Sequence, residues 1–345
     1  MCPRLNCVKS ILFWPTELTA HMKRMKKPVE FSDAAVWAAW LYYVDELTQK
    51  EIADRLGTSR VTVIKLLAEA KERGLVKIEI DTTVASHVAL SRQMADRFGL
   101  QEALIIPSLK DGDDLKRLGR AASMMLVGSL KDGETLAVAW GRTVAAVAQS
   151  VPGHTRVNDI TVCQLVASPD GMASDFSPEL CSSLLANRLG AKCVNILAPA
   201  VVSNAGVRAS LMAEPSIAAQ FEVIRNASTA LFGVGELGAG STISTHNVHK
   251  PETLSAVEAD GALAVIMGLF IDADGNEVRS AVHDRLIGAT LENLHAIPRR
   301  ICVAGGLHKT AAIRAALRGN LATHLVIDEA TAQNVLRSDV SDQPG

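Results

Sequence analysis

The stretch that most constrains the fold of this chain covers residues 48–80, which have the pattern of two short helices, a tight turn and a strand. Thr48 is suited to cap the first helix, because Glu51 stands three residues later and can complete a capping box. Gly57 is suited to end this helix, since glycine readily takes the positive φ of a helix C-terminus. The stretch therefore predicts a helix-turn-helix motif.

The second helix of the motif is predicted to start after a cap at Thr58 or Ser59 and to end at Gly74. Four apolar residues at helical spacing are predicted to form its buried stripe: Val61, Ile64, Leu67 and Ala68. Residues 76–80 then alternate between apolar and polar side chains, which is typical of a strand. Together these elements predict a winged helix-turn-helix domain.

The exposed face of the second helix is expected to carry Arg, Lys and hydroxyl side chains near its N-terminus. Such a helix suits the major groove of DNA, where Arg can bond to guanine edges and Ser, Thr or Lys can reach bases or phosphates. The predicted DNA-binding residues are Thr48, Gln49, Thr58, Ser59, Arg60, Thr62 and Lys65. Arg60 is the first candidate for base readout. The alternative is an ordinary helical hairpin with a solvated basic face, but the agreement of caps, turn and spacing favours DNA binding.

Two further segments surround this motif. Ser32 or Asp33 can cap a preceding helix that runs to Val44, whose apolar side chains are expected to pack on the motif: Val36, Trp37, Trp40 and Val44. We predict a disordered extension over residues 1–30 and a DNA-binding domain over residues 31–82. Residues 83–99 are amphipathic and end in glycine. They are predicted to be a linker helix that couples two domains or pairs two chains, or else the first helix of the next domain.

The length of 345 residues requires a second, larger domain, which we place at residues 100–338. The apolar fraction of 48% and the charged fraction of 21% are those of a globular protein. Apolar runs are too short for a membrane span or a signal peptide, so we expect a cytoplasmic protein without a membrane partner. The six cysteines are scattered, and neither a metal site nor a cofactor is predicted.

The large domain is predicted to be a doubly wound, mostly parallel α/β fold, because short apolar runs alternate with amphipathic segments. The predicted strands cover residues 103–106, 135–139, 160–166, 193–197, 229–234, 262–267, 270–271, 300–303 and 324–327, with a turn at 272–275. The predicted helices cover residues 113–130, 143–150, 177–189, 216–226, 310–317 and 330–336.

Four loops after predicted strands carry residues suited to hold a ligand, and ligands of such sheets bind at the carboxyl ends of strands. The candidates are Gly141, Arg142 and Thr143 in the first loop, Gly235 in the second, Gly305, Gly306 and Lys309 in the third, and Asp328 and Glu329 in the fourth. The helix start after Gly141 would attract an anion, to which Arg142 and Lys309 add positive charge. Asp328 is suited to cap the last helix, and its carboxylate can also accept ligand hydroxyl groups.

The order of these motifs resembles that of a known family. A helix-turn-helix (TQKEIADRLGTSRVTVIKLL) is followed by WGRT, then ICVAGGLHKTAAIRAALRGN, then LVIDEATAQNVL. The chain from Ala38 to Leu336 is similar to the SorC family of bacterial sugar-responsive transcriptional regulators. The resemblance implies a large domain with the fold of phosphosugar isomerases, glucosamine-6-phosphate deaminase and CoA transferases. It implies a bound sugar, phosphosugar or polyol as effector, an operator near a catabolic operon, and assembly into a homotetramer or dimer.

The resemblance also assigns roles to residues and shows a departure. Gly141, Arg142 and Thr143 are similar to the family's effector loop, Lys309 to its effector-facing lysine, and Asp328 and Glu329 to its terminal strand-end motif. Where the family often has an acidic residue, this chain has Val265, so its effector is expected to be smaller, less hydroxylated or differently placed. Two alternatives stay open. One is a sugar-phosphate isomerase or deaminase with an added DNA-binding-like domain, and the other is a constitutive DNA-binding protein. The sequence lacks nucleophile-elbow, zinc-protease and P-loop signatures, which weakens the enzyme alternative.

Overall fold

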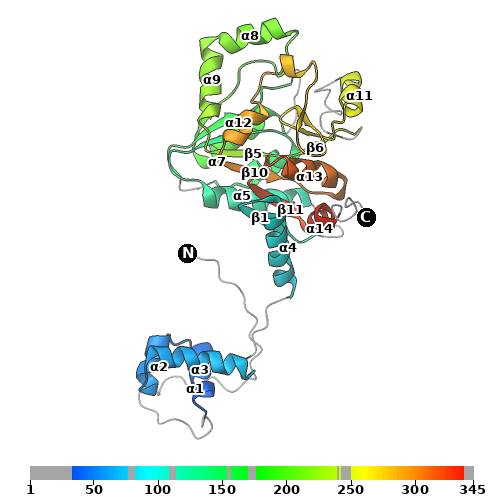
Figure 1. Cartoon of the computed structure of the whole chain (residues 1–345). Helices are drawn as coiled ribbons and strands as arrows, with labels where there is room; N and C mark the ends of the chain where they lie inside the picture. Colours follow the sequence, from blue (N-terminus) through cyan, green and yellow to red (C-terminus); the bar gives the residue numbers. More distant parts are fainter. Residues whose placement is uncertain are drawn as a thin grey trace. The chain divides into compact units, whose positions relative to one another are not determined.

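The computed structural model describes residues 33–76, 82–108, 114–153, 157–169, 176–238, 241 and 250–337. The chain divides into two compact units, Met1–Ala85 and Ser86–Gly345 (Figure 1). The predicted N-terminal extension and residues 77–80 of the predicted wing strand lie outside the described residues.

The smaller unit contains the predicted helices α1 (Ala34–Tyr43), α2 (Gln49–Leu56) and α3 (Arg60–Glu72). Thr48 and Glu51 form the predicted capping box, and Gly57 ends α2 with a φ of 64°. Of the two candidate caps for α3, Ser59 is the one used, because its side chain accepts a hydrogen bond from the N–H of Thr62. The caps depend on residues close together in sequence, which is why the sequence predicts them well.

The predicted apolar stripe of α3 was wrong for three of its four residues, because Val61, Ile64 and Ala68 are exposed and only Leu67 is buried. The core face consists instead of Val63, Leu67 and Ala70, which pack in one cluster with the small alanines of α1. The same error affects α1, where Trp37 is buried but Trp40 and Val44 are exposed. In each helix, two different groups of apolar residues have the spacing of a helix face. Packing against the neighbouring helices decides which of the two groups is buried.

The larger unit is built on a seven-stranded sheet in the order β1-β11-β10-β5-β2-β3-β4, and every neighbouring pair is parallel. Its strands are β1 (Glu102–Ile106), β2 (Thr135–Val138), β3 (Thr161–Gln164), β4 (Lys192–Val194), β5 (Thr229–Phe232), β10 (Arg299–Val303) and β11 (His324–Asp328). The predicted doubly wound, mostly parallel fold is confirmed.

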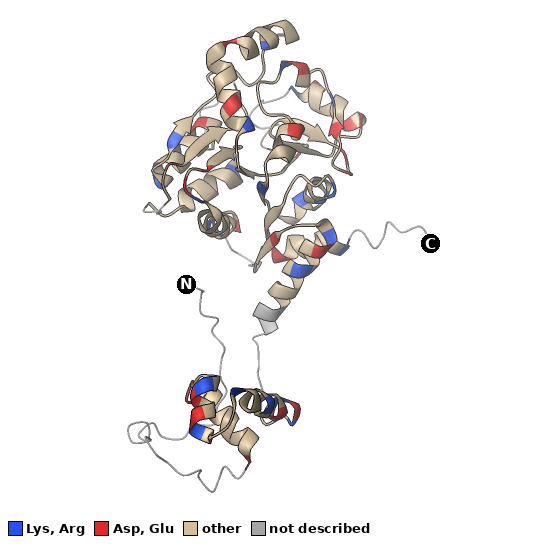
Figure 2. Cartoon of the chain, turned by 60° about the vertical axis from the view of Figure 1, so that its left-hand side comes forward, with Lys and Arg blue, Asp and Glu red and all other residues tan. Residues whose placement is uncertain are grey.

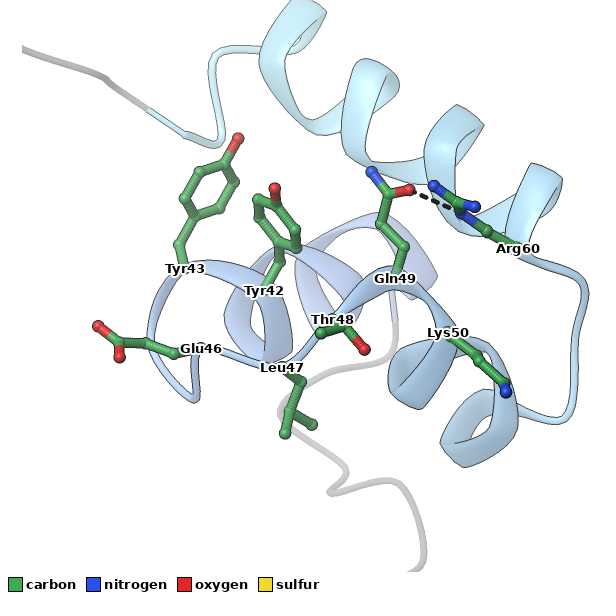
Figure 3. A pocket seen from close by; sticks show the side chains of 8 residues that line it. All are labelled: Tyr42, Tyr43, Glu46, Leu47, Thr48, Gln49, Lys50 and Arg60. Carbon is green, nitrogen blue, oxygen red and sulfur yellow. Dashed lines mark hydrogen bonds between the residues drawn. The ribbon is translucent and has the colours of Figure 1, made fainter. Parts of the chain in front are cut away.

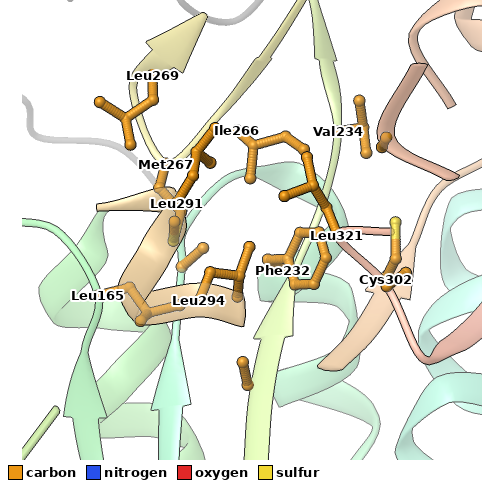
Figure 4. Packing of buried hydrophobic residues seen from close by; sticks show 14 of the residues in the cluster. Leu165, Phe232, Val234, Ile266, Met267, Leu269, Leu291, Leu294, Cys302 and Leu321 are labelled. Carbon is orange, nitrogen blue, oxygen red and sulfur yellow. The ribbon is translucent and has the colours of Figure 1, made fainter. Parts of the chain in front are cut away.

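Helices cover both faces of this sheet. One face packs against α5 (Asp114–Ser129), α6 (Arg142–Ser150) and α7 (Pro178–Leu189). The other packs against α4 (Thr82–Phe98), α9 (Pro215–Arg225), α12 (Leu291–Ala296), α13 (Thr310–Arg318) and α14 (Glu329–Arg337). Successive residues of a strand point to opposite faces of the sheet, and each face has its own hydrophobic core. Leu136 and Val138 lie in the core with α5, α6 and α7, whereas Ala137 lies in the core on the other face. Figure 4 shows Phe232, Leu294 and Cys302 in the second core.

A second, antiparallel sheet lies in the order β6-β7-β8-β9. Its strands are β6 (Gly235–Glu236), β7 (Ala264–Ile266), β8 (Leu269–Ile271) and β9 (Glu277–Val278). Met267 and Gly268, with φ of 54° and 81°, make the tight turn between β7 and β8. The predicted turn at residues 272–275 is present and joins β8 to β9, a strand that was not predicted. Helices α8 (Ala205–Ala213), α11 (Pro251–Ala259) and α12 were not predicted.

Candidate effector pocket and DNA-binding surface

A small pocket of about 80 Å³ lies where β2, β5 and the β7–β8 hairpin end. Its lining comes from the segments that follow β2 and β5, including the start of α6 and of β6, from the β7–β8 hairpin and from the loop after β10. The lining residues are Ala139, Trp140, Gly141, Arg142, Thr143, Val144, Gly233, Val234, Gly235, Val265, Met267, Gly268 and Lys309. The predicted residues Gly141, Arg142, Thr143, Gly235 and Lys309 are therefore brought together. Because β2, β5 and β10 are neighbours in a parallel sheet, their carboxyl ends meet at one edge.

Helix α6 begins at this pocket without a side-chain cap. Its cap residue is Gly141, whose φ of 116° lies in a region that other residues rarely adopt. The N–H of Gly141 donates to the carbonyl of Phe176 over 3.2 Å, which fixes the turn. Because no side chain caps the helix, its positive end is left to attract an anion.

Two cationic side chains share the pocket. Arg142 is exposed, whereas Lys309 is half-buried. Burial lowers the pKa of Lys309 below its usual value of 10.5, and the positive charge of Arg142 lowers it further. The carboxylate of Glu236 acts in the opposite direction but does not restore the pKa. An anionic ligand would relieve this repulsion between like charges.

Asp328 is buried at the end of β11, does not line the pocket and accepts four hydrogen bonds from neighbouring residues. One oxygen accepts from the N–H of Thr331 (2.9 Å) and the hydroxyl of Ser108 (3.2 Å). The other accepts from the N–H of Gly306 (2.9 Å) and the hydroxyl of Thr331 (2.7 Å). Burial raises the pKa of Asp328, but these donors outweigh it and the pKa is lowered. The geometry favours a role in holding the glycine loop that leads to Lys309.

The two glycines of this loop, and Glu329 beside it, also lie outside the pocket lining. A Cβ atom on Gly305 would stand 2.5 Å from Oδ2 of Asp328, so glycine is needed for this close approach. Gly306 has a φ of 100°. Glu329 accepts from Nε2 of His87 over 3.1 Å and from Gln333 over 3.3 Å. Gly305 and Gly306 therefore shape the loop that leads to Lys309, and Glu329 bonds to His87 of α4 outside the pocket lining.

The pocket also contains apolar residues that sequence reasoning missed, namely Trp140, Val234 and Met267. Met267 lies in the tight turn of the β7–β8 hairpin, which the sequence pattern did not mark as a turn. Val265 lies in the wall, and its Cγ1 is 2.7 Å from the position of a Cβ on Gly235. Glycine at 235 thus makes room for valine at 265.

The smaller unit has an open hollow of about 610 Å³, lined by Tyr42, Tyr43, Glu46, Leu47, Thr48, Gln49, Lys50 and Arg60 (Figure 3). Nε of Arg60 donates to Oε1 of Gln49 over 3.2 Å, so two predicted DNA-binding residues support each other. The two tyrosines and Lys50 were not predicted. Lys and Arg are mixed with Asp and Glu in this unit rather than gathered in one block (Figure 2).

The other predicted DNA-binding residues fall into two groups. Thr48, Ser59 and Thr62 are engaged in helix capping, since Ser59 and Thr62 share a hydrogen bond between hydroxyls of 2.9 Å and Thr48 bonds to Glu51. Lys65 is exposed on α3, and Thr58 is half-buried in the turn. Arg60 and Lys65 are exposed, whereas Gln49 is half-buried with its Oε1 bonded to Arg60.

A helix-turn-helix unit joined to an α/β unit with a strand-end pocket defines the class of ligand-controlled DNA-binding proteins. Within the described residues, no three His, Cys, Asp or Glu side chains gather to hold a metal ion. Nor does that part of the chain contain a helix long and apolar enough to cross a membrane.

Comparison with known proteins identifies the family. Residues 38–93 match the Crp-like helix-turn-helix domain, and residues 82–337 match the family described as "Putative sugar-binding domain". The chain is 34% identical over 315 residues to the uncharacterized transcriptional regulator YjhU of Escherichia coli K12, covering 89% of this chain and 95% of that one. It is 33% identical over 305 residues to the transcriptional regulator LsrR of the same strain, covering 87% and 93%.

The solved structure of the full-length sorbitol operon regulator SorC from Klebsiella pneumoniae has the same fold. Its TM-score is 0.70 at 24% identity, and the match covers 89% of this chain and all of that one. The chain belongs to the SorC family of sugar-binding transcriptional regulators, as its motifs predict. It is a sugar-responsive DNA-binding regulator, and the comparisons do not support the enzyme alternative.

Proposed function

We propose that the effector is a sugar or polyol carrying an anionic group, with a phosphate as the best fit, and that its binding changes operator affinity. The observation that carries this proposal is the meeting of Arg142 and Lys309 at the uncapped start of α6. Guanidinium, ammonium and helix N-terminus are the three common donors to phosphate in proteins. The apolar wall at Val265 and Met267 favours a compact, sparsely hydroxylated ligand.

Each predicted effector residue then has a distinct role. Arg142, Lys309 and the first turn of α6 with Gly141 and Thr143 bind the anion. Gly235 makes room in the wall, whereas Gly305, Gly306 and Asp328 position the loop that leads to Lys309. Glu329 is bonded to His87 and has an indirect role.

The protein acts as a regulator without turnover in this proposal. Among the described residues that line the pocket, the titratable side chains are Arg142 and Lys309, and both are basic, which suits the binding of an anion. We place the protein in the cytoplasm on an operator of a carbohydrate or polyol catabolic operon, as a homotetramer or dimer. We assign residues 31–82 to DNA binding, 83–99 to coupling and 100–338 to effector binding.

The test is a thermal-shift screen with pairs of sugars and polyols that differ by one phosphate. Each phosphorylated hit should stabilise the protein more than its partner and change its affinity for its upstream DNA. Arg142→Gln and Lys309→Met should each weaken binding about 10- to 100-fold, since hydrogen bonds to charged groups contribute about 1.5–3 kcal/mol.

Lys192→Met is the matched control, because Lys192 is an exposed lysine at the edge strand of the same unit. Equal stabilisation by both members of every pair would contradict an anionic effector. Turnover of a sugar phosphate by the purified protein would revive the enzyme alternative.

A further inference from the structure

The outward face of α3 presents apolar side chains to solvent. Val61 is 62% exposed and Ile64 is 46% exposed, although both are β-branched and apolar. The core side of the same helix is already occupied by Val63 and Leu67. A single exposed apolar residue is ordinary on a protein surface, but these two stand three residues apart and are neighbours on one helix face.

This apolar pair is flanked by the cations predicted to contact DNA. Lys65 lies one turn after Val61, and Arg60 lies one turn before Ile64. Ala68, one turn after Ile64, is also exposed. The surface is therefore a mixed strip of Arg60, Val61, Ile64, Lys65 and Ala68, which starts at the first residue of the helix. In helix-turn-helix proteins, the N-terminal residues of the second helix reach the base edges.

The occupant that fits this strip is the major groove of DNA at thymine. The 5-methyl group of thymine is the apolar feature of that groove, and it is read by apolar side chains. We propose that Val61 and Ile64 recognise thymine methyl groups next to the base contacted by Arg60. The inference rests on the DNA-binding role of α3, and it adds that sequence discrimination comes in part from apolar contacts rather than from basic residues alone.

The charge pattern supports DNA over a protein partner. Nε of Arg60 donates to Gln49, and Arg60 precedes Val61 and lies one turn before Ile64, so a cation belongs to the same helix face as the apolar pair. A protein-binding apolar face would not need cations at both ends, whereas a base-reading face is bounded by groups that bind guanine or phosphate. The strip is thus continuous with the predicted DNA-contacting residues.

The experiment uses the full-length protein and an operator obtained by selection from a random DNA pool. Each thymine of the selected half-site is replaced in turn by deoxyuridine, which removes only the 5-methyl group. For the wild-type protein, Kd should rise about fourfold at one or two positions, because burying one methyl-sized group is worth about 0.8 kcal/mol. With Val61→Ala or Ile64→Ala, Kd for the thymine operator should rise and the discrimination against uracil at the matching position should vanish.

Two controls separate apolar readout from other causes. Val88→Ala makes the same change at an exposed valine of α4 and should leave the discrimination intact. Lys65→Ala should reduce the slope of log Kd against log salt concentration by about 1, the value expected for the loss of one phosphate contact. Val61→Ala should leave that slope unchanged.

Wild-type protein that binds thymine and uracil operators equally would overturn the inference while leaving the DNA-binding role intact. The inference would also be overturned if Val61→Ala and Ile64→Ala kept the preference for thymine over uracil at every position. A change in the mass of the assembly in light scattering would overturn it too, because Val61 and Ile64 would then contact a second copy of the chain. Failure of the wild-type protein to select any DNA would instead overturn the DNA-binding role itself.

Discussion

Lys309 shows how a single residue can connect burial to ligand affinity. Its ammonium is half-buried beside Arg142, and its pKa is lowered by that burial and by the neighbouring charge. The protonated form of Lys309 is therefore less favourable than that of an ordinary lysine. A bound anion stabilises the protonated form, because its negative charge lies close to the ammonium group.

This residue predicts a pH dependence of effector affinity. Because the pKa of Lys309 is below 10.5, the protonated fraction falls at a lower pH than for an ordinary lysine. Affinity for an anionic effector should therefore decline as pH rises through the lowered pKa, and binding there should take up a proton. Titration calorimetry in buffers of different ionisation enthalpy measures both effects. Lys309→Arg, which stays charged, should flatten the profile; an unchanged profile would exclude Lys309 as the titrating group.

At the scale of elements, the contact between α5 and α6 is closer than most side chains allow. A Cβ atom on Gly119 would lie 2.5 Å from the carbonyl oxygen of Ala146, whereas a Cβ on Gly128 of the same helix would meet no atom within 4 Å. The first glycine is a packing requirement, and the second is only a weak helix former.

Two identical substitutions in α5 should therefore have opposite effects. Gly119→Ala should lower the free energy of unfolding of the larger unit by about 1–3 kcal/mol through overpacking. Gly128→Ala should raise it by up to about 1 kcal/mol, because alanine is the better helix former. Urea unfolding of both variants beside the wild type measures the difference. Similar changes in both would show that α6 shifts to accommodate the added methyl group.

At the scale of the whole molecule, the question is how the pocket is linked to DNA. The loop before Lys309 is tied to Asp328 through the N–H of Gly306, and the next residue, Glu329, bonds to His87 on α4. Helix α4 runs across the boundary between the two units of the chain. We propose that a shift of the loop on effector binding reaches α4 by this route.

Breaking this link should weaken the coupling and spare each binding event. In His87→Ala, the effector-induced change in operator Kd should shrink by about 2- to 30-fold, as expected for coupling residues worth about 0.5–2 kcal/mol. Affinity for effector alone, and for operator without effector, should stay close to wild type. The control is Arg92→Ala, an exposed residue of α4. An unchanged coupling factor in His87→Ala, measured by fluorescence anisotropy, would rule out this route.

Much of the architecture follows from the sequence alone, because it depends on residues close together in the chain. Thr48 with Glu51, and Ser59 with Thr62, cap their helices within four residues, and Gly57 ends α2 through its own φ. Strand-helix alternation likewise implies parallel pairing with helices on both faces. The loop residues Gly141, Arg142 and Thr143 could be placed at a strand end for the same reason.

Only the tertiary structure decided which face of α3 is buried and which strand-end residues reach the pocket. Val61 and Val63 have the same hydrophobicity, and packing against α1 selects Val63 for the core. Asp328 and Lys309 both follow strands, yet Asp328 is enclosed by donors from Ser108 and Thr331 while Lys309 lines the pocket. Periodicity and residue type can be read from a single segment of the sequence. Burial and hydrogen-bond partners depend on segments far apart in the chain, so they are determined only when these segments come together in the folded protein.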